Sequence, residues 1–62
     1  MILKGKSLYF VTEAVERHIG WLELELERDG LSEDAVSDFS NDLGYYRAIL
    51  QDMRSEIARE RA

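Results

Sequence analysis

Residues 20–30 read GWLELELERDG and combine two periodicities that predict different structures. Leucine alternates with glutamate from Leu22 to Glu27, and a period of two is typical of a half-buried strand. The residues around this stretch instead repeat every three or four positions, as one face of a helix does. In a helix, Leu24 lies about 200° around the axis from Leu22. One helix with an apolar face on each side therefore accounts for both periodicities.

The second half of the chain carries the clearest helical pattern. Its apolar residues recur at alternating spacings of three and four, which is the a/d pattern of a heptad. Ser32 is a candidate N-cap, and Glu33 and Asp34 stand in the first turn, where they complement the positive end of the helix dipole. We expect a helix from about residue 33 to about residue 59. Its predicted inner residues are Val36, Phe39, Leu43, Tyr46, Leu50, Met53 and Ile57.

The first half predicts another helix, from about residue 8 to about residue 29, with Ser7 as its candidate N-cap. Its predicted inner residues are Leu8, Val15, Ile19, Leu22 and Leu26. Gly30 can adopt the left-handed conformation just past a helix end, so residues 30–32 are expected to form the turn. Helices joined by so short a turn are antiparallel neighbours. The expected fold is therefore all-α, a single helical hairpin over residues 1–62.

The same first helix has a second apolar face. We call it the outer stripe; it consists of Phe10, Ala14, Arg17, Trp21 and Leu24, spaced four, three, four and three residues apart. An uncovered apolar face usually marks an interaction site. Gly20, beside Trp21, would allow another helix to approach closely, and Tyr45 is a further interface candidate on the second helix. The sequence thus predicts an interface formed by the outer stripe, Gly20 and Tyr45.

A different interpretation keeps the alternation as β-structure. Residues 8–12 and 21–26 are rich enough in aromatic, branched and alternating residues to form two strands, with Gly20 between them. Such a sheet would have two bare edges and little stability of its own. The helical interpretation is therefore preferred.

The size of the chain predicts self-association. A domain of 62 residues has a small core that offsets the entropy of chain ordering only narrowly. There is no cysteine for a disulfide, and the single His18 has no companion ligands for a structural metal, so no cofactor is expected. The remaining source of buried surface is another copy of the chain. We expect a homodimer in which two hairpins form a four-helix bundle.

The charges are unevenly distributed along the chain, whose net charge is −5. Residues 21–42 contain eight carboxylates and a single basic residue, Arg28, whereas residues 1–10 and 51–62 together contain five basic and three acidic residues. An antiparallel dimer would set the acidic turn of one copy beside the basic ends of the other. The acidic total argues against nonspecific nucleic-acid binding, which depends on phosphate neutralisation. Because no apolar run is long enough for a membrane span and no leader is evident, we expect a cytoplasmic protein.

No set of residues typical of an active site is present. His18 has no partner constellation, Ser40 lacks the glycine-flanked turn that exposes a nucleophile, and the four glycines are too isolated to cradle a phosphate. We therefore expect no enzymatic activity. The predicted function is that of a small regulatory or adaptor protein, which binds an unidentified protein partner and dimerises as part of its structure.

Two resemblances supply alternative functions. Residues 30–43, GLSEDAVSDFSNDL, resemble the turn and second helix of the small aspartyl-phosphate phosphatases of the sporulation phosphorelay, which are also short antiparallel hairpins. That family's Ser-Gln-Glu-Leu-Asp motif is similar to Ser40-Asn41-Asp42-Leu43, although Gly44 replaces the last acidic residue. The resemblance implies binding to a response regulator.

The second resemblance is to Rop-like plasmid copy-number regulators, in length and hairpin architecture. It implies a dimeric four-helix bundle that binds RNA. An RNA-binding surface of this chain would require its terminal basic residues to form one patch. These residues are Lys4, Lys6, Arg54, Arg59 and Arg61.

Overall fold

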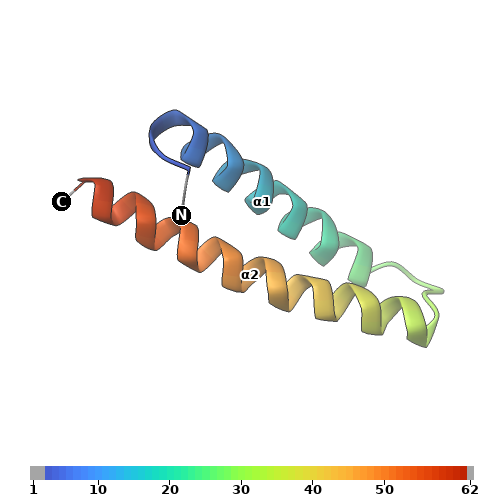
Figure 1. Ribbon diagram of the computed structural model, residues 1–62. Coiled ribbons are helices and arrows are strands. Elements are labelled where there is room, and N and C mark those ends of the chain that lie inside the picture. The colour runs from blue at the N-terminus through green and yellow to red at the C-terminus, as the bar shows by residue number, and fades with distance from the viewer. Residues whose placement is uncertain (1–2, 62) are drawn as a thin grey trace.

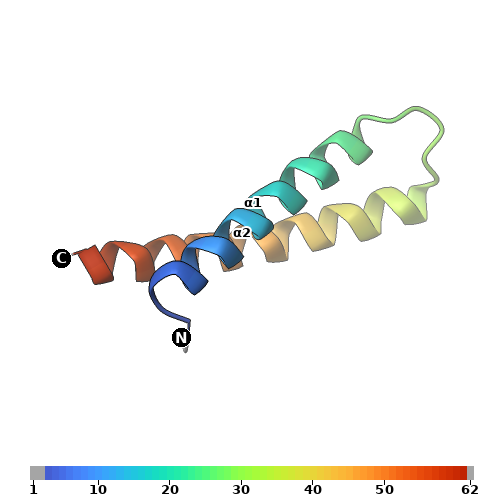
Figure 2. The same cartoon turned by 90° about the horizontal axis from the view of Figure 1, so that it is seen from above.

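The computed structural model describes residues 3–61 and contains two α-helices, α1 (Gly5–Leu26) and α2 (Glu33–Arg61). The helices run antiparallel and cross at an angle, and the two ends of the described chain lie at the same end of the molecule (Figures 1 and 2). The molecule is a rod of 45 × 16 × 15 Å. The predicted all-α hairpin is confirmed. The two-strand alternative is wrong, because no residue from 3 to 61 belongs to a strand.

The core lies between the helices and is formed by the predicted inner faces. Ile19 and Leu22 of α1 pack with Leu43 and Leu50 of α2 in one buried cluster. The residues packed around this cluster are Val15, Leu26, Phe39 and Tyr46. Val36, predicted to be an inner residue, is instead exposed. Because α1 ends at Leu26, no helix lies opposite the first turn of α2.

The helix α1 begins three residues earlier than predicted, and Ser7 is not its cap. Lys4 occupies the N-cap position without offering a side-chain hydrogen bond. The carboxylate of Glu60, in the last turns of α2, instead accepts the backbone N–H of Gly5, with 3.2 Å between the nitrogen and each oxygen. A negative group at this point also complements the positive end of the α1 dipole. The cap of α1 thus comes from the other helix.

The helix α1 also ends three residues before the predicted position. The N–H of Glu27 donates to the carbonyl of Leu24 at 3.1 Å and that of Arg28 to the carbonyl of Glu25 at 3.2 Å, so the chain tightens into bonds three residues apart. The last turn of α1 contains no basic residue. Carboxylates at this end face the negative pole of the helix dipole, which disfavours another helical turn.

The turn and the start of α2 follow the sequence signals closely. Gly30 has φ of +81°, so its left-handed conformation is confirmed, although it lies beyond the helix end by several residues. The hydroxyl of Ser32 accepts the backbone N–H of Ala35 at 3.1 Å, which confirms Ser32 as the N-cap. At its other end α2 extends to Arg61, slightly past the predicted end, and Arg59 and Arg61 stand in its last turn, where cations are favourable.

A ladder of polar contacts closes one edge of the hairpin. The pairs are Glu23 with Arg47 (Oε2 to Nη2, 3.5 Å), Glu16 with Arg54 (Oε1 to Nη2, 3.4 Å) and Tyr9 with Arg61 (Oη to Nε, 2.9 Å). Successive members are seven residues apart in each helix, so the two residue numbers of every pair add to 70. Flanking positions of heptads make such contacts between neighbouring helices. The ladder therefore marks the register of α1 against α2.

Candidate interaction surface

The outer stripe of α1 is exposed at both of its ends. Phe10 and Leu24 are each 66% exposed, and Trp21 is 47% exposed. Leu22 and Ile19 are buried against α2 on the other side of the same helix. The alternation of residues 20–30 thus corresponds to a helix whose leucines divide between a covered and an uncovered face.

Trp21 is held in place by other aromatic residues. Its ring stacks on His18 with 5.5 Å between centroids and meets Phe39 of α2 edge to face at 5.8 Å. His18 in turn contacts Tyr46 of α2 edge to face at 4.6 Å. Such pairs fix ring orientation. Trp21 therefore joins the outer stripe to α2, whereas the sequence pattern had placed the stripe wholly on the far side of α1.

Arg17, which interrupts the apolar outer stripe, forms an ion pair on the helix surface. The Arg17 guanidinium lies 2.7 Å from the Glu13 carboxylate one turn earlier, and both side chains are largely exposed. Ala14, next to them, is also exposed and leaves a low point between the larger residues. The outer stripe thus has large apolar side chains toward both ends, and a small residue and a charged pair at its centre.

Gly20 is not required by the packing of α1 against α2. A Cβ atom built at this position would have no heavy atom within 4 Å beyond the helix itself. Glycine inside a helix costs roughly 1 kcal/mol relative to alanine. The hairpin carries this cost without using the space, which leaves the backbone beside Trp21 accessible to another chain.

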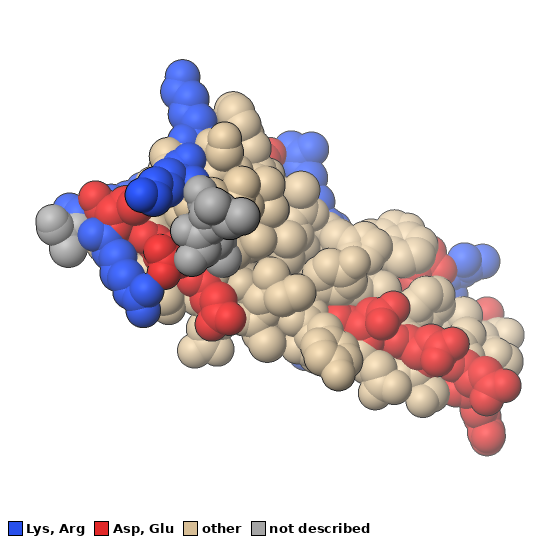
Figure 3. Space-filling view, viewed as in Figure 1, with Lys and Arg blue, Asp and Glu red and all other residues tan. Residues whose placement is uncertain are grey.

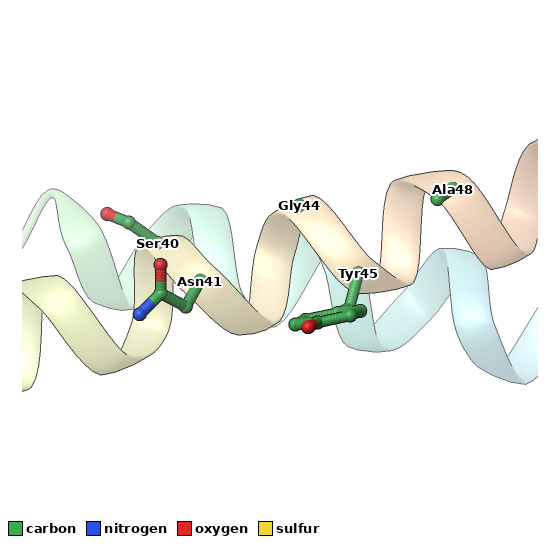
Figure 4. A pocket seen from close by; sticks show the side chains of 5 residues that line it. All are labelled: Ser40, Asn41, Gly44, Tyr45 and Ala48. Carbon is green, nitrogen blue, oxygen red and sulfur yellow. The ribbon is translucent and has the colours of Figure 1, made fainter.

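Tyr45 lies on a different surface from the outer stripe. It is 74% exposed on α2 and borders a shallow depression lined by Ser40, Asn41, Gly44 and Ala48, all of α2 (Figure 4). The interface predicted from the sequence did not include Ile49, which is exposed one turn after Tyr45. The four-residue spacing of these two apolar residues was the available signal. The predicted interface is therefore divided between α1 and α2.

Charged side chains are concentrated toward the ends of the rod. In the view of Figure 3, acidic side chains gather over α2 toward the turn, basic and acidic side chains lie together at the opposite end, and a largely uncharged band lies between. Of the terminal basic residues, Arg54 contacts Glu16, Arg59 contacts Glu56 and Arg61 contacts Tyr9. All five ion pairs among residues 3–61 use arginine, and neither Lys4 nor Lys6 takes part.

The residues considered as possible catalytic groups lie apart from one another or are packed against neighbouring side chains. His18 is half-buried in the aromatic cluster, and Ser40 and Asn41 face outward with the exposed Asp42 beside them. No group of three or more His, Asp or Glu side chains within residues 3–61 is arranged to hold a metal ion. Neither described helix is long and apolar enough to cross a membrane. Comparisons of the chain with known protein families, curated proteins and solved structures gave no match.

Proposed function

We propose that this protein is a non-enzymatic regulatory or adaptor protein that acts by binding proteins through the outer stripe, and that its working form is a homodimer. The observation that carries the proposal is the exposure of Phe10, Trp21 and Leu24 along one side of α1. Large exposed apolar residues on one side of a small chain are typical of a surface that another protein covers.

Two further observations support the outer stripe as the binding surface. Trp21 is held by His18 and Phe39, so little side-chain entropy is lost when a partner covers the rest of its ring. Trp is also among the residues that contribute most to binding energy at interfaces. Gly20 adds an open stretch of backbone next to it.

Light scattering over a wide range of protein concentrations tests the proposal. The unmodified chain is expected to have the molar mass of a dimer, and Leu24→Glu is expected to give a folded monomer because it places a charge in the interface. Ser55→Glu is the matched control, since Ser55 is exposed on α2 and outside the outer stripe. Circular dichroism checks that both variants remain helical. A chain that stays monomeric at every concentration would refute the homodimer.

The alternative functions make different demands on the chain. RNA binding would have to recruit arginines that already contact Glu16, Glu56 and Tyr9. Binding to a response regulator would use α2, where Asn41 and Asp42 are exposed. A mobility shift with RNA at low salt, or a complex with a receiver domain that Asp42→Asn abolishes, would favour the respective alternative over the outer stripe.

A further inference from the structure

We infer that the outer stripe binds a second copy of this chain in antiparallel orientation, with Lys6 of each copy at the level of Glu25 of the other. The inference rests on the proposed homodimer and names its geometry. It follows from the charges that flank the outer stripe and from the sizes of the residues within it.

The two ends of the outer stripe carry opposite charge. Lys6 lies one helical turn before Phe10 and takes part in none of the ion pairs among residues 3–61. Glu25 lies one turn after Trp21; its side chain is 17% exposed and forms an ion pair with the exposed Arg28 at 2.8 Å. A parallel pair of α1 helices would place lysine beside lysine and glutamate beside glutamate. The antiparallel pair brings opposite charges to the same level at both ends, on the two sides of the outer stripe.

The spacing within the outer stripe selects one antiparallel register. Phe10, Arg17 and Leu24 are seven residues apart, and Ala14 and Trp21 form the second heptad series. In antiparallel coiled-coil packing, residues of the first series lie opposite residues of the second. The register with the most apolar contact places Phe10 opposite the partner's Trp21, so paired residue numbers add to about 31.

Arg17 and Ala14 fit this register, and Leu24 lies at its end, opposite the partner's Ser7. Arg17 then lies opposite the partner's Ala14, whose small side chain leaves room for it. The guanidinium that pairs with Glu13 at 2.7 Å in its own helix also comes within a turn of the partner's Glu13. Gly20 borders the same interface, where its bare backbone allows close approach. Lys6 and the partner's Glu25 occupy the same register, because their numbers also add to about 31.

Cysteine cross-linking tests the orientation without interference, since the chain contains no cysteine. Lys6→Cys and Glu25→Cys are made separately, one of them with a tag that changes its mass. A short bismaleimide reagent, which spans the 8–10 Å between packed helices, is applied to each variant alone and to their mixture. Ser40→Cys and Ser55→Cys, both exposed on α2, form the control pair.

The mixture of Lys6→Cys and Glu25→Cys is expected to form the mixed-mass cross-link on the order of a hundredfold faster than the control pair, because a dimer raises the effective thiol concentration from micromolar toward millimolar. Faster cross-linking of either variant with itself would show a parallel pair and overturn the inference. A dimer by light scattering in which no cysteine pair exceeds the control would also overturn it, while leaving the proposed homodimer intact. A monomer by light scattering overturns both.

Discussion

The carboxylate of Glu60 caps α1 from the far end of the chain by accepting the N–H of Gly5, 55 residues earlier. Replacement by glutamine removes the charge, and replacement by alanine removes the acceptor. We expect Glu60→Ala to lower the free energy of unfolding by roughly 0.5–1 kcal/mol, at the lower end of cap effects because the site is exposed. Faster amide hydrogen exchange in the first turn of α1 would locate the effect. Asp52→Asn, at another exposed carboxylate of α2, is the control and should change neither measurement.

Truncation of Leu22 should destabilise the fold and truncation of Leu24 should not, although the two residues are only two positions apart. Leu22 is 1% exposed in the core, so Leu22→Ala is expected to lower the free energy of unfolding by about 2–5 kcal/mol. For so small a protein this loss is enough to unfold most of the molecules. Leu24 is 66% exposed, so Leu24→Ala should preserve the helical signal in circular dichroism. Its melting temperature should differ from that of the unmodified chain only at concentrations where the dimer forms. Equal unfolding by the two variants would contradict the described faces of α1.

The hydroxyl of Thr12 offers a separate test of the core. Thr12 is buried, and its hydroxyl donates to the carbonyl of Leu8 in the preceding turn at 2.7 Å. That carbonyl lies within the helix and has the helical backbone as an alternative partner. We expect Thr12→Val to change the free energy of unfolding by less than about 1 kcal/mol, whereas Thr12→Ala should lower it further by leaving a void. Chemical denaturation of both variants measures the difference.

Gly20 and Gly44 should separate folding from association. Both lie inside helices, and a Cβ atom would meet nothing within 4 Å at either position. Alanine at either site is expected to stabilise the hairpin by roughly 0.5–1 kcal/mol through its helix propensity. Gly20→Ala should at the same time weaken the dimer, because the added methyl group stands where the partner approaches, and Gly44→Ala should not. A dimer indifferent to Gly20→Ala would count against the proposed close approach at this glycine.

The inner faces of both helices could be predicted from the sequence because burial follows the heptad spacing directly. The cap at Ser32 was also predictable, since a side chain that bonds three residues ahead is a local feature. The cap at Gly5 was not, because Glu60 reaches it only once the helices have packed. Val36 had the spacing of an inner residue, yet its burial depended on where α1 ends.

The candidate interface could be predicted only in part. The angle between Leu22 and Leu24 around the helix follows from helical geometry, so the exposure of Leu24 was foreseeable. The attachment of Trp21 to Phe39 was not, because a large ring reaches beyond the position of its own Cα. The register of the ladder was likewise out of reach, since charged pairs such as Glu16 with Arg54 depend on how far one helix is displaced along the other.

Both ends of the described chain lie at one end of a rod 45 Å long, as the contact between Gly5 and Glu60 requires (Figure 1). An antiparallel pair of such rods would hold anything fused to a terminus of one copy far from anything fused to the other. The dimer would then set a fixed separation between two attached proteins and would not bring them together.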